Sequence, residues 1–157
     1  MRIELAPELQ KRFRVALRDA GRREIGGMLF AEQIKADHFR IVDFSLDAYS
    51  GSHTAFRRDP WTHQRMLEEF FQRTGHDYVR FNYLGEWHSH PSFSVHPSRE
   101  DVGTMTDIVH NEGSAITFAV LLIVRLRWSF LMDHSVTVFA RDRAPEPTRV
   151  RRQVVWI

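Results

Sequence analysis

The chain has 157 residues, a length typical of one domain that buries its own hydrophobic core. Its 22 basic residues nearly balance its 20 acidic ones, which gives little support to nucleic-acid binding, and its 12 phenylalanines and 4 tryptophans argue against disorder. There is no cysteine, so disulfides, thiol nucleophiles and cysteine-bound zinc are excluded, and any metal must be held by histidine and carboxylate.

The predicted elements alternate between helices and strands. In chain order, apolar periodicity and turn residues predict a helix over 7–20, strands over 24–32 and 37–46, an exposed polar loop over 47–59, a helix over 60–74, a strand over 78–90, a helix over 98–111, strands over 115–124, 127–132 and 135–141, a proline-containing turn over 145–147 and a strand-like end over 149–157. This order predicts a single α/β domain, residues 1–157, in which helices cover a mixed sheet.

The apolar segments do not predict a membrane protein. The N-terminal residues lack the continuous apolar run of a signal peptide. The longest apolar run, AITFAVLLIV (115–124), is much shorter than the about 20 residues of a membrane-spanning helix, and it predicts a buried strand instead. We therefore expect a cytoplasmic protein without a membrane partner.

The segment GEWHSHPSFSVHPSRED (85–101) contains residue types that bind metals. His88 and His90 lie at i and i+2 near the end of a predicted strand, so both imidazoles point to one face and can reach one ion. The stretch SRED (98–101) supplies carboxylates at the start of the next helix. Two imidazoles and one carboxylate would leave the fourth position of a tetrahedral zinc ion to water, as in catalytic zinc sites.

Other interpretations of these residues stay open at this level. An isolated His-x-His is weak evidence for a metal site, and His96 or Glu100 can replace Asp101 as the third ligand. Ser98 and Asp101 also fit an acidic capping box, which stabilises a helix by about 1 kcal/mol. The capping box is compatible with metal binding, because Asp101 has a second carboxylate oxygen. Helical His-Glu-x-x-His zinc sites are excluded, because that motif is absent.

The stretch HSHPSFSVHPSRED (88–101) resembles the signature of the JAB/MPN metalloprotease family, the JAMM motif: His-x-His-Pro, six residues, then Ser-x-x-Asp. The family also has a glutamate on an early strand, followed by small residues, and Glu24 in REIGGMLF matches it. Trp87 matches the aromatic residue before the first histidine. The resemblance covers roughly residues 1–142 and implies a single-domain JAB/MPN-like, cytidine deaminase-like fold, a mixed sheet sandwiched by helices.

The resemblance implies one zinc ion per chain, held by His88, His90 and Asp101, with Glu24 as the general acid/base. Zinc lowers the pKa of a bound water from about 15.7 to near 7. Glu24 would accept a proton from this water and return it to the leaving amine. Ser98 would stabilise the oxyanion, a role that competes with its capping role for one side chain.

The motif spacing favours Asp101 over His96 and Glu100 as the third ligand. Ser89, between the two histidines, is expected to support the site rather than to act in catalysis. For Glu24, the alternative without the resemblance is a solvated charge at a strand edge.

The resemblance also implies a substrate class. Family members with the complete motif are mostly peptidases or isopeptidases that cut after the C-terminal glycine of ubiquitin or a ubiquitin-like protein. Such an extended tail can add as a strand to a sheet edge beside the metal. The expected substrate contacts are Phe56, Arg57, Trp87 and Phe93, although core packing is an equal alternative for Trp87.

The short chain is similar to compact bacterial relatives that occur beside ubiquitin-activating-like and conjugating-like enzymes, including those of phage-defence operons. The sequence therefore predicts a zinc deconjugating peptidase that acts with such enzymes on a ubiquitin-like or otherwise C-terminally conjugated protein. One alternative is a processing peptidase for sulfur-carrier ubiquitin-like proteins. Another is a non-catalytic MPN-like scaffold, although such relatives typically lack metal ligands.

Overall fold

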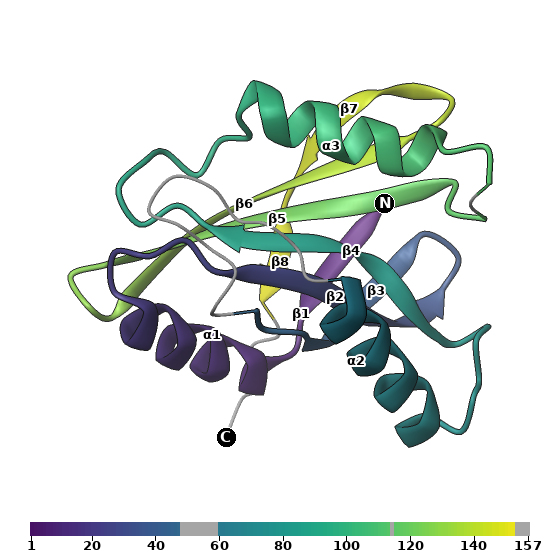
Figure 1. Ribbon diagram of the computed structural model, residues 1–157, viewed down its shortest axis with the longest axis horizontal. Helices are drawn as coiled ribbons and strands as arrows, with labels where there is room; N and C mark the ends of the chain where they lie inside the picture. The colour runs from purple at the N-terminus through teal and green to yellow at the C-terminus, as the bar shows by residue number, and fades with distance from the viewer. Residues whose placement is uncertain (48–59, 114, 153–157) are drawn as a thin grey trace.

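One mixed eight-stranded sheet organises the computed structural model, which describes residues 1–47, 60–113 and 115–152 (Figure 1). In chain order the elements are β1 (Arg2–Leu5), α1 (Pro7–Ala20), β2 (Gly26–Lys35), β3 (His38–Phe44), α2 (Pro60–Arg73), β4 (Phe81–Ser89), α3 (Arg99–His110), β5 (Phe118–Arg127), β6 (Leu131–Ala140), β7 (Arg143–Thr148) and β8 (Val150–Arg152). The strand order is β7-β6-β5-β4-β2-β3-β1-β8. β4 therefore lies in the middle of the sheet, between β2 and β5.

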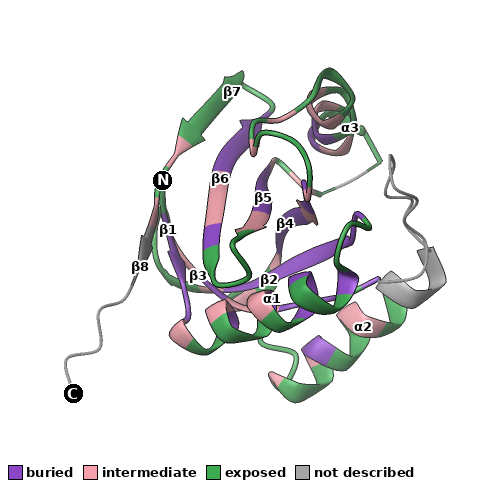
Figure 2. Cartoon of the chain, turned by 90° about the vertical axis from the view of Figure 1, so that its left-hand side faces the viewer, coloured by how far each residue is buried: buried purple, intermediate pink, exposed green. Residues whose placement is uncertain are grey.

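The sheet is strongly curled (Figure 2). β7 and β8 stand at opposite ends of the strand order, yet only Arg149 separates them in the chain. The two ends of the sheet must therefore approach each other. On the inside of the curl, Phe39 of β3 and Phe118 of β5 bring their ring centroids within 5.4 Å.

Helices cover both faces of this sheet. Successive side chains of a strand point to opposite faces, so β2 and β5 are apolar on both sides. The hydrophobic core between α1 and the sheet includes Phe13, Leu29 and Leu122. The core between α2 and the sheet includes Phe30 and Phe70, and the core between α3 and the sheet includes Met105 and Leu121. α2 and α3 thus share the face opposite α1. None of the described helices has the length and apolar character that a membrane span requires.

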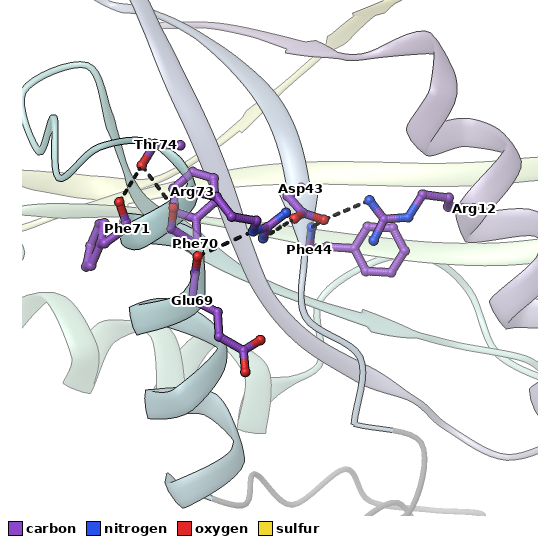
Figure 3. A network of polar contacts seen from close by, with 8 residues as sticks. All are labelled: Arg12, Asp43, Phe44, Glu69, Phe70, Phe71, Arg73 and Thr74. Atoms are coloured by element: carbon purple, nitrogen blue, oxygen red, sulfur yellow. Dashed lines mark hydrogen bonds and ion pairs between the residues drawn. The ribbon is translucent and has the colours of Figure 1, made fainter.

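Arg12 of α1 and Arg73 of α2 bind the same carboxylate on β3 (Figure 3). The nearest nitrogen of each lies 2.7 and 2.8 Å, respectively, from an oxygen of Asp43. Burial by itself raises the pKa of Asp43, but the hydrogen bonds from Arg73, Arg12 and the Phe44 backbone lower it overall. Asp43 therefore stays ionised and joins both helices to one strand.

The structure confirms the predicted helices as α1, α2 and α3, and the first three predicted strands as β2, β3 and β4. The short strand β1 was not predicted. It pairs with β3 in parallel, a long-range pairing for which four residues carry no local signal.

Two predictions near the C-terminus are wrong. The separate strands at 127–132 and 135–141 are replaced by one hairpin, in which β5 extends to Arg127 and β6 begins at Leu131. Its turn has Trp128 and Ser129 at φ 49° and 63°, where glycine or asparagine would have given a turn signal. The predicted turn at 145–147 lies inside β7, which tolerates prolines because it is an edge strand. The predicted terminal strand is confirmed for β8, and its remainder, 153–157, lies outside the described residues.

Candidate metal centre

The side chains of His88, His90 and Asp101 meet between the end of β4 and the first turn of α3. His88 Nε2 lies 3.0 Å from His90 Nε2 and 3.3 Å from Asp101 Oδ1, and His90 Nε2 lies 3.9 Å from Asp101 Oδ2. Zinc bonds of about 2.0–2.1 Å in a tetrahedron separate neighbouring donor atoms by about 3.3–3.4 Å. The donor set and its spacing therefore fit a zinc ion with three protein ligands.

The end of β4 orients the two histidines. His90 N–H donates to Val124 O of β5 at 2.9 Å, and Pro91, which has no N–H, turns the chain off the sheet. His90 Nδ1 lies 2.6 Å from Ser94 O, so Nδ1 carries the hydrogen and Nε2 keeps its lone pair for a metal.

The loop that carries Ser94 is held by the β5–β6 hairpin. Arg125 donates to Phe93 O at 2.9 Å and to Asp133 Oδ2 at 2.8 Å, and Ser135 donates to Val95 O. No local signal in the sequence predicts this support. Arg125 lies 32 residues after Phe93, so only the folded hairpin brings the two together.

The capping box predicted for Ser98 and Asp101 is confirmed. Asp101 Oδ2 accepts the Ser98 N–H at 2.6 Å, and Ser98 Oγ accepts the Asp101 N–H at 3.1 Å. The other carboxylate oxygen, Oδ1, is the one nearest His88. Burial raises the pKa of Asp101, but His88 and the Ser98 hydrogen bonds outweigh it and lower the pKa from 3.8 to about 2. Asp101 is therefore a carboxylate that caps the helix with Oδ2 and presents Oδ1 to His88.

The Ser98 hydroxyl accepts the cap hydrogen bond, which leaves its own hydrogen available to a second partner. Ser98 also lines the cavity at the cluster. The two predicted roles of Ser98 are therefore compatible, because one uses its lone pair and the other its proton.

Glu24 lies just before β2, is 8% exposed and lines the same cavity as the cluster. In the register of β2 with β4, Gly26 pairs with His88. This pairing brings Glu24, two residues before Gly26, and the histidines of the motif to the same end of the two strands. A Cβ atom on Gly26 would lie 2.5 Å from Trp87 O, so only glycine allows this approach. Burial raises the pKa of Glu24, although His90 and His88 act against it. A raised pKa makes Glu24 a better proton acceptor.

The cavity has a volume of about 600 Å³ and brings Glu24, Ser98, Phe93 and the three cluster residues together. Phe93 is 54% exposed, and its ring lies 6.3 Å from that of His90, where a substrate can reach it. His96 and Glu100 also line the cavity but do not belong to the cluster of three donors. Phe56 and Arg57 lie outside the described residues.

Trp87 packs in the core. It is 1% exposed, its ring lies edge-on to Phe13 and Phe44, and its Nε1–H donates to Ser45 O at 2.8 Å. Its neighbour His88 points to the opposite face, since side chains alternate along β4. The structure therefore favours core packing over substrate contact for the Trp87 indole.

The expected sheet edge beside the metal site is not formed by β4. Residues 85–88 pair with β2 on one side, and residues 85–89 pair with β5 on the other. A further strand therefore cannot hydrogen-bond to β4 next to the cluster.

Comparisons with known proteins agree with this fold. Residues 6–145 match the family model described as prokaryotic homologs of the JAB domain. The CD-NTase/cGAS isopeptidase of Escherichia coli (strain TW11681) is 33% identical over 81 residues, which are 50% of this chain and 49% of that protein. The match thus spans about half the length of this curated relative.

Two solved structures share the fold. The solution structure of a Desulfitobacterium hafniense protein has a TM-score of 0.69 at 19% identity, over 96% of this chain and 92% of that one. The crystal structure of a JAB1/MPN domain protein from Archaeoglobus fulgidus has a TM-score of 0.53 at 16% identity, over 96% and 97%. The predicted JAB/MPN-like α/β fold is confirmed.

Proposed function

This chain belongs to the prokaryotic JAB-domain family, and we propose that it is a zinc-dependent isopeptidase or peptidase. Its substrate would be a ubiquitin-like or similarly conjugated protein, cut after the C-terminus of that protein in a bacterial conjugation pathway such as phage defence. The observation that carries the proposal is the convergence of His88, His90, Asp101 and Glu24 on one cavity. The isopeptidase named among the relatives supports the choice of bond.

His88, His90 and Asp101 would hold the zinc. When bound, zinc lowers the pKa of water to near 7 and polarises a carbonyl oxygen. Two features of the residues favour binding: Ser94 O fixes the hydrogen of His90 on Nδ1, and Asp101 is ionised well below neutral pH. His90 Nε2 and the Asp101 carboxylate then offer lone pairs to the ion.

Glu24 would move the proton. Its carboxylate accepts a hydrogen from the attacking water and later protonates the leaving amine, which for an isopeptide bond is a lysine amine. The burial of Glu24 serves both steps, because it raises the pKa of Glu24 toward that of the groups with which it exchanges the proton. The Ser98 hydroxyl would donate to the carbonyl oxygen as negative charge develops there.

The test is cleavage of fusions in which a ubiquitin-like domain ending in Gly-Gly is joined to a reporter through a peptide bond or a lysine isopeptide bond. We expect chelator-sensitive cleavage, mapped by mass spectrometry to the bond after the last glycine, and about one zinc per chain by elemental analysis. Glu24→Gln should abolish turnover and keep the zinc, because Glu24 is outside the donor cluster. Absence of both zinc and cleavage would instead support a non-catalytic scaffold.

A further inference from the structure

Ser89 holds the chain at the residue that follows Glu24. Its Oγ accepts the Ile25 N–H at 3.0 Å, and its own N–H donates to Ile25 O at 2.8 Å. Both residues are almost fully buried, at 2% and 1% exposed. Water therefore cannot replace either residue as the hydrogen-bond partner of the other. Ile25 and Ser89 are 64 positions apart in the sequence.

The hydroxyl replaces a missing backbone acceptor. Gly26 pairs with His88, so Ile25 and Ser89 are the next pair in the antiparallel register and would normally exchange two backbone hydrogen bonds. One of these is present, from Ser89 N–H to Ile25 O. The second is made to the side chain, because the backbone leaves β4 at Ser89 and His90 N–H turns to Val124 of β5. The bend that presents His90 to the cluster thus requires a short side-chain acceptor at position 89.

We infer that Ser89 is a positioning residue, which through Ile25 fixes the place of Glu24 relative to the His88–His90–Asp101 cluster. The inference rests on the proposed function. Ser89 stands between the two histidines, and Ile25 directly follows Glu24, so the two hydrogen bonds between Ser89 and Ile25 link the donor cluster to the proton-transfer group. Without the hydroxyl, the start of β2 must shift to find another acceptor, and a displacement of about 1 Å at a catalytic group can cost about 100-fold in rate.

Ser45, the residue after β3, provides a matched control for Ser89. Its Oγ accepts the Met28 N–H at 2.7 Å, and it is fully buried. It therefore makes the same kind of hydrogen bond to β2 as Ser89, but at a residue farther from Glu24. Ser89→Ala and Ser45→Ala each leave one buried backbone amide, that of Ile25 or of Met28, without its acceptor, so both should lower Tm by several degrees.

The kinetic test uses a fusion that the wild-type protein cleaves. Ser89→Ala should lower kcat by about 10- to 100-fold with unchanged KM and unchanged zinc content, whereas Ser45→Ala should keep kcat within about twofold. Ser89→Thr, which keeps the hydroxyl, should recover most of the kcat lost in Ser89→Ala. Equal kcat values for Ser89→Ala and Ser45→Ala would overturn the inference.

A second readout needs neither metal nor substrate. In the metal-free protein, amide hydrogen exchange at Ile25 should be about 10-fold or more faster in Ser89→Ala than in wild type, and unchanged in Ser45→Ala. Unchanged exchange at Ile25 in Ser89→Ala overturns the inference alone. A wild-type protein without chelator-sensitive cleavage overturns the proposed function and this inference together, so the two failures are distinguishable.

Discussion

Replacing Ser98 by glycine and by alanine separates its cap role from its oxyanion role. Ser98 Oγ accepts the Asp101 N–H, whereas the Asp101 carboxylate accepts the Ser98 N–H. Both substitutions remove the first of these hydrogen bonds and keep the second, because the second uses only the backbone of residue 98. The Asp101 side chain therefore keeps its capping contact, and we expect the zinc content of both variants to match wild type.

The two variants differ in stability, although both lack the Ser98 hydroxyl. Alanine at an N-cap costs about 1 kcal/mol of unfolding free energy, and glycine only about a few tenths. In a chain of this size, about 1 kcal/mol lowers Tm by about 2–4 °C. Both variants lack the hydroxyl hydrogen, so both should lower kcat by about 100- to 1,000-fold, the cost of one oxyanion donor.

The assay combines calorimetric Tm values with initial rates of fusion cleavage and elemental zinc analysis. The expected result is a large loss of kcat in both variants, with a clear fall in Tm for Ser98→Ala only. A Ser98→Gly variant that keeps the wild-type kcat would refute the oxyanion role and leave Ser98 as a helix cap.

Two further predictions concern ionic interactions. Asp43→Asn should lower the unfolding free energy at neutral pH by about 1 kcal/mol, because it weakens ion pairs with Arg12 and Arg73 that are half exposed. Since the pKa of Asp43 is lowered from 3.8, this contribution is complete above that value and is lost as pH falls through the lowered pKa. Urea unfolding at neutral pH and in acid measures it, and a difference that persists in acid contradicts the reasoning. Zinc at about 100 times its dissociation constant should stabilise the metal-free protein by about 2.7 kcal/mol, or about 5–10 °C in Tm. An unchanged Tm would contradict the zinc site, and Asp101→Asn should reduce the shift.

The sequence predicted the parts of the fold that depend on local periodicity. α1, α2 and α3 have apolar stripes, and β2 and β4 have strand patterns, so each could be identified in isolation. β1 and the hairpin turn at Trp128-Ser129 could not. The first is formed by pairing with a distant strand, and the second uses residues at positive φ that rarely form such turns.

The candidate site likewise has parts that a local sequence pattern predicts and parts that only the folded sheet defines. The spacing of His88, His90 and Asp101 follows from one strand end and one helix start, which a motif records. The supporting contacts of Ser89 and Arg125 depend on strand register and on hairpin position. These are properties of the folded sheet: the motif indicates a supporting role for Ser89 but not its partner Ile25, and no local pattern indicates that Arg125 holds the loop.

The placement of the two halves of the site on different strands has a physical consequence. β4 is hydrogen-bonded on both sides at His88, and His90, just after its end, is held by its N–H bond to Val124 of β5. Glu24 instead precedes β2, where regular pairing has not yet begun and where Ile25 depends on a side-chain acceptor. A donor cluster needs fixed distances to hold an ion, and β4 together with the α3 capping box supplies them. A proton-transfer group, the role proposed for Glu24, must stay in place while its charge changes. The hydrogen bonds between Ser89 and Ile25 would hold Glu24 in place without using either of its carboxylate oxygens.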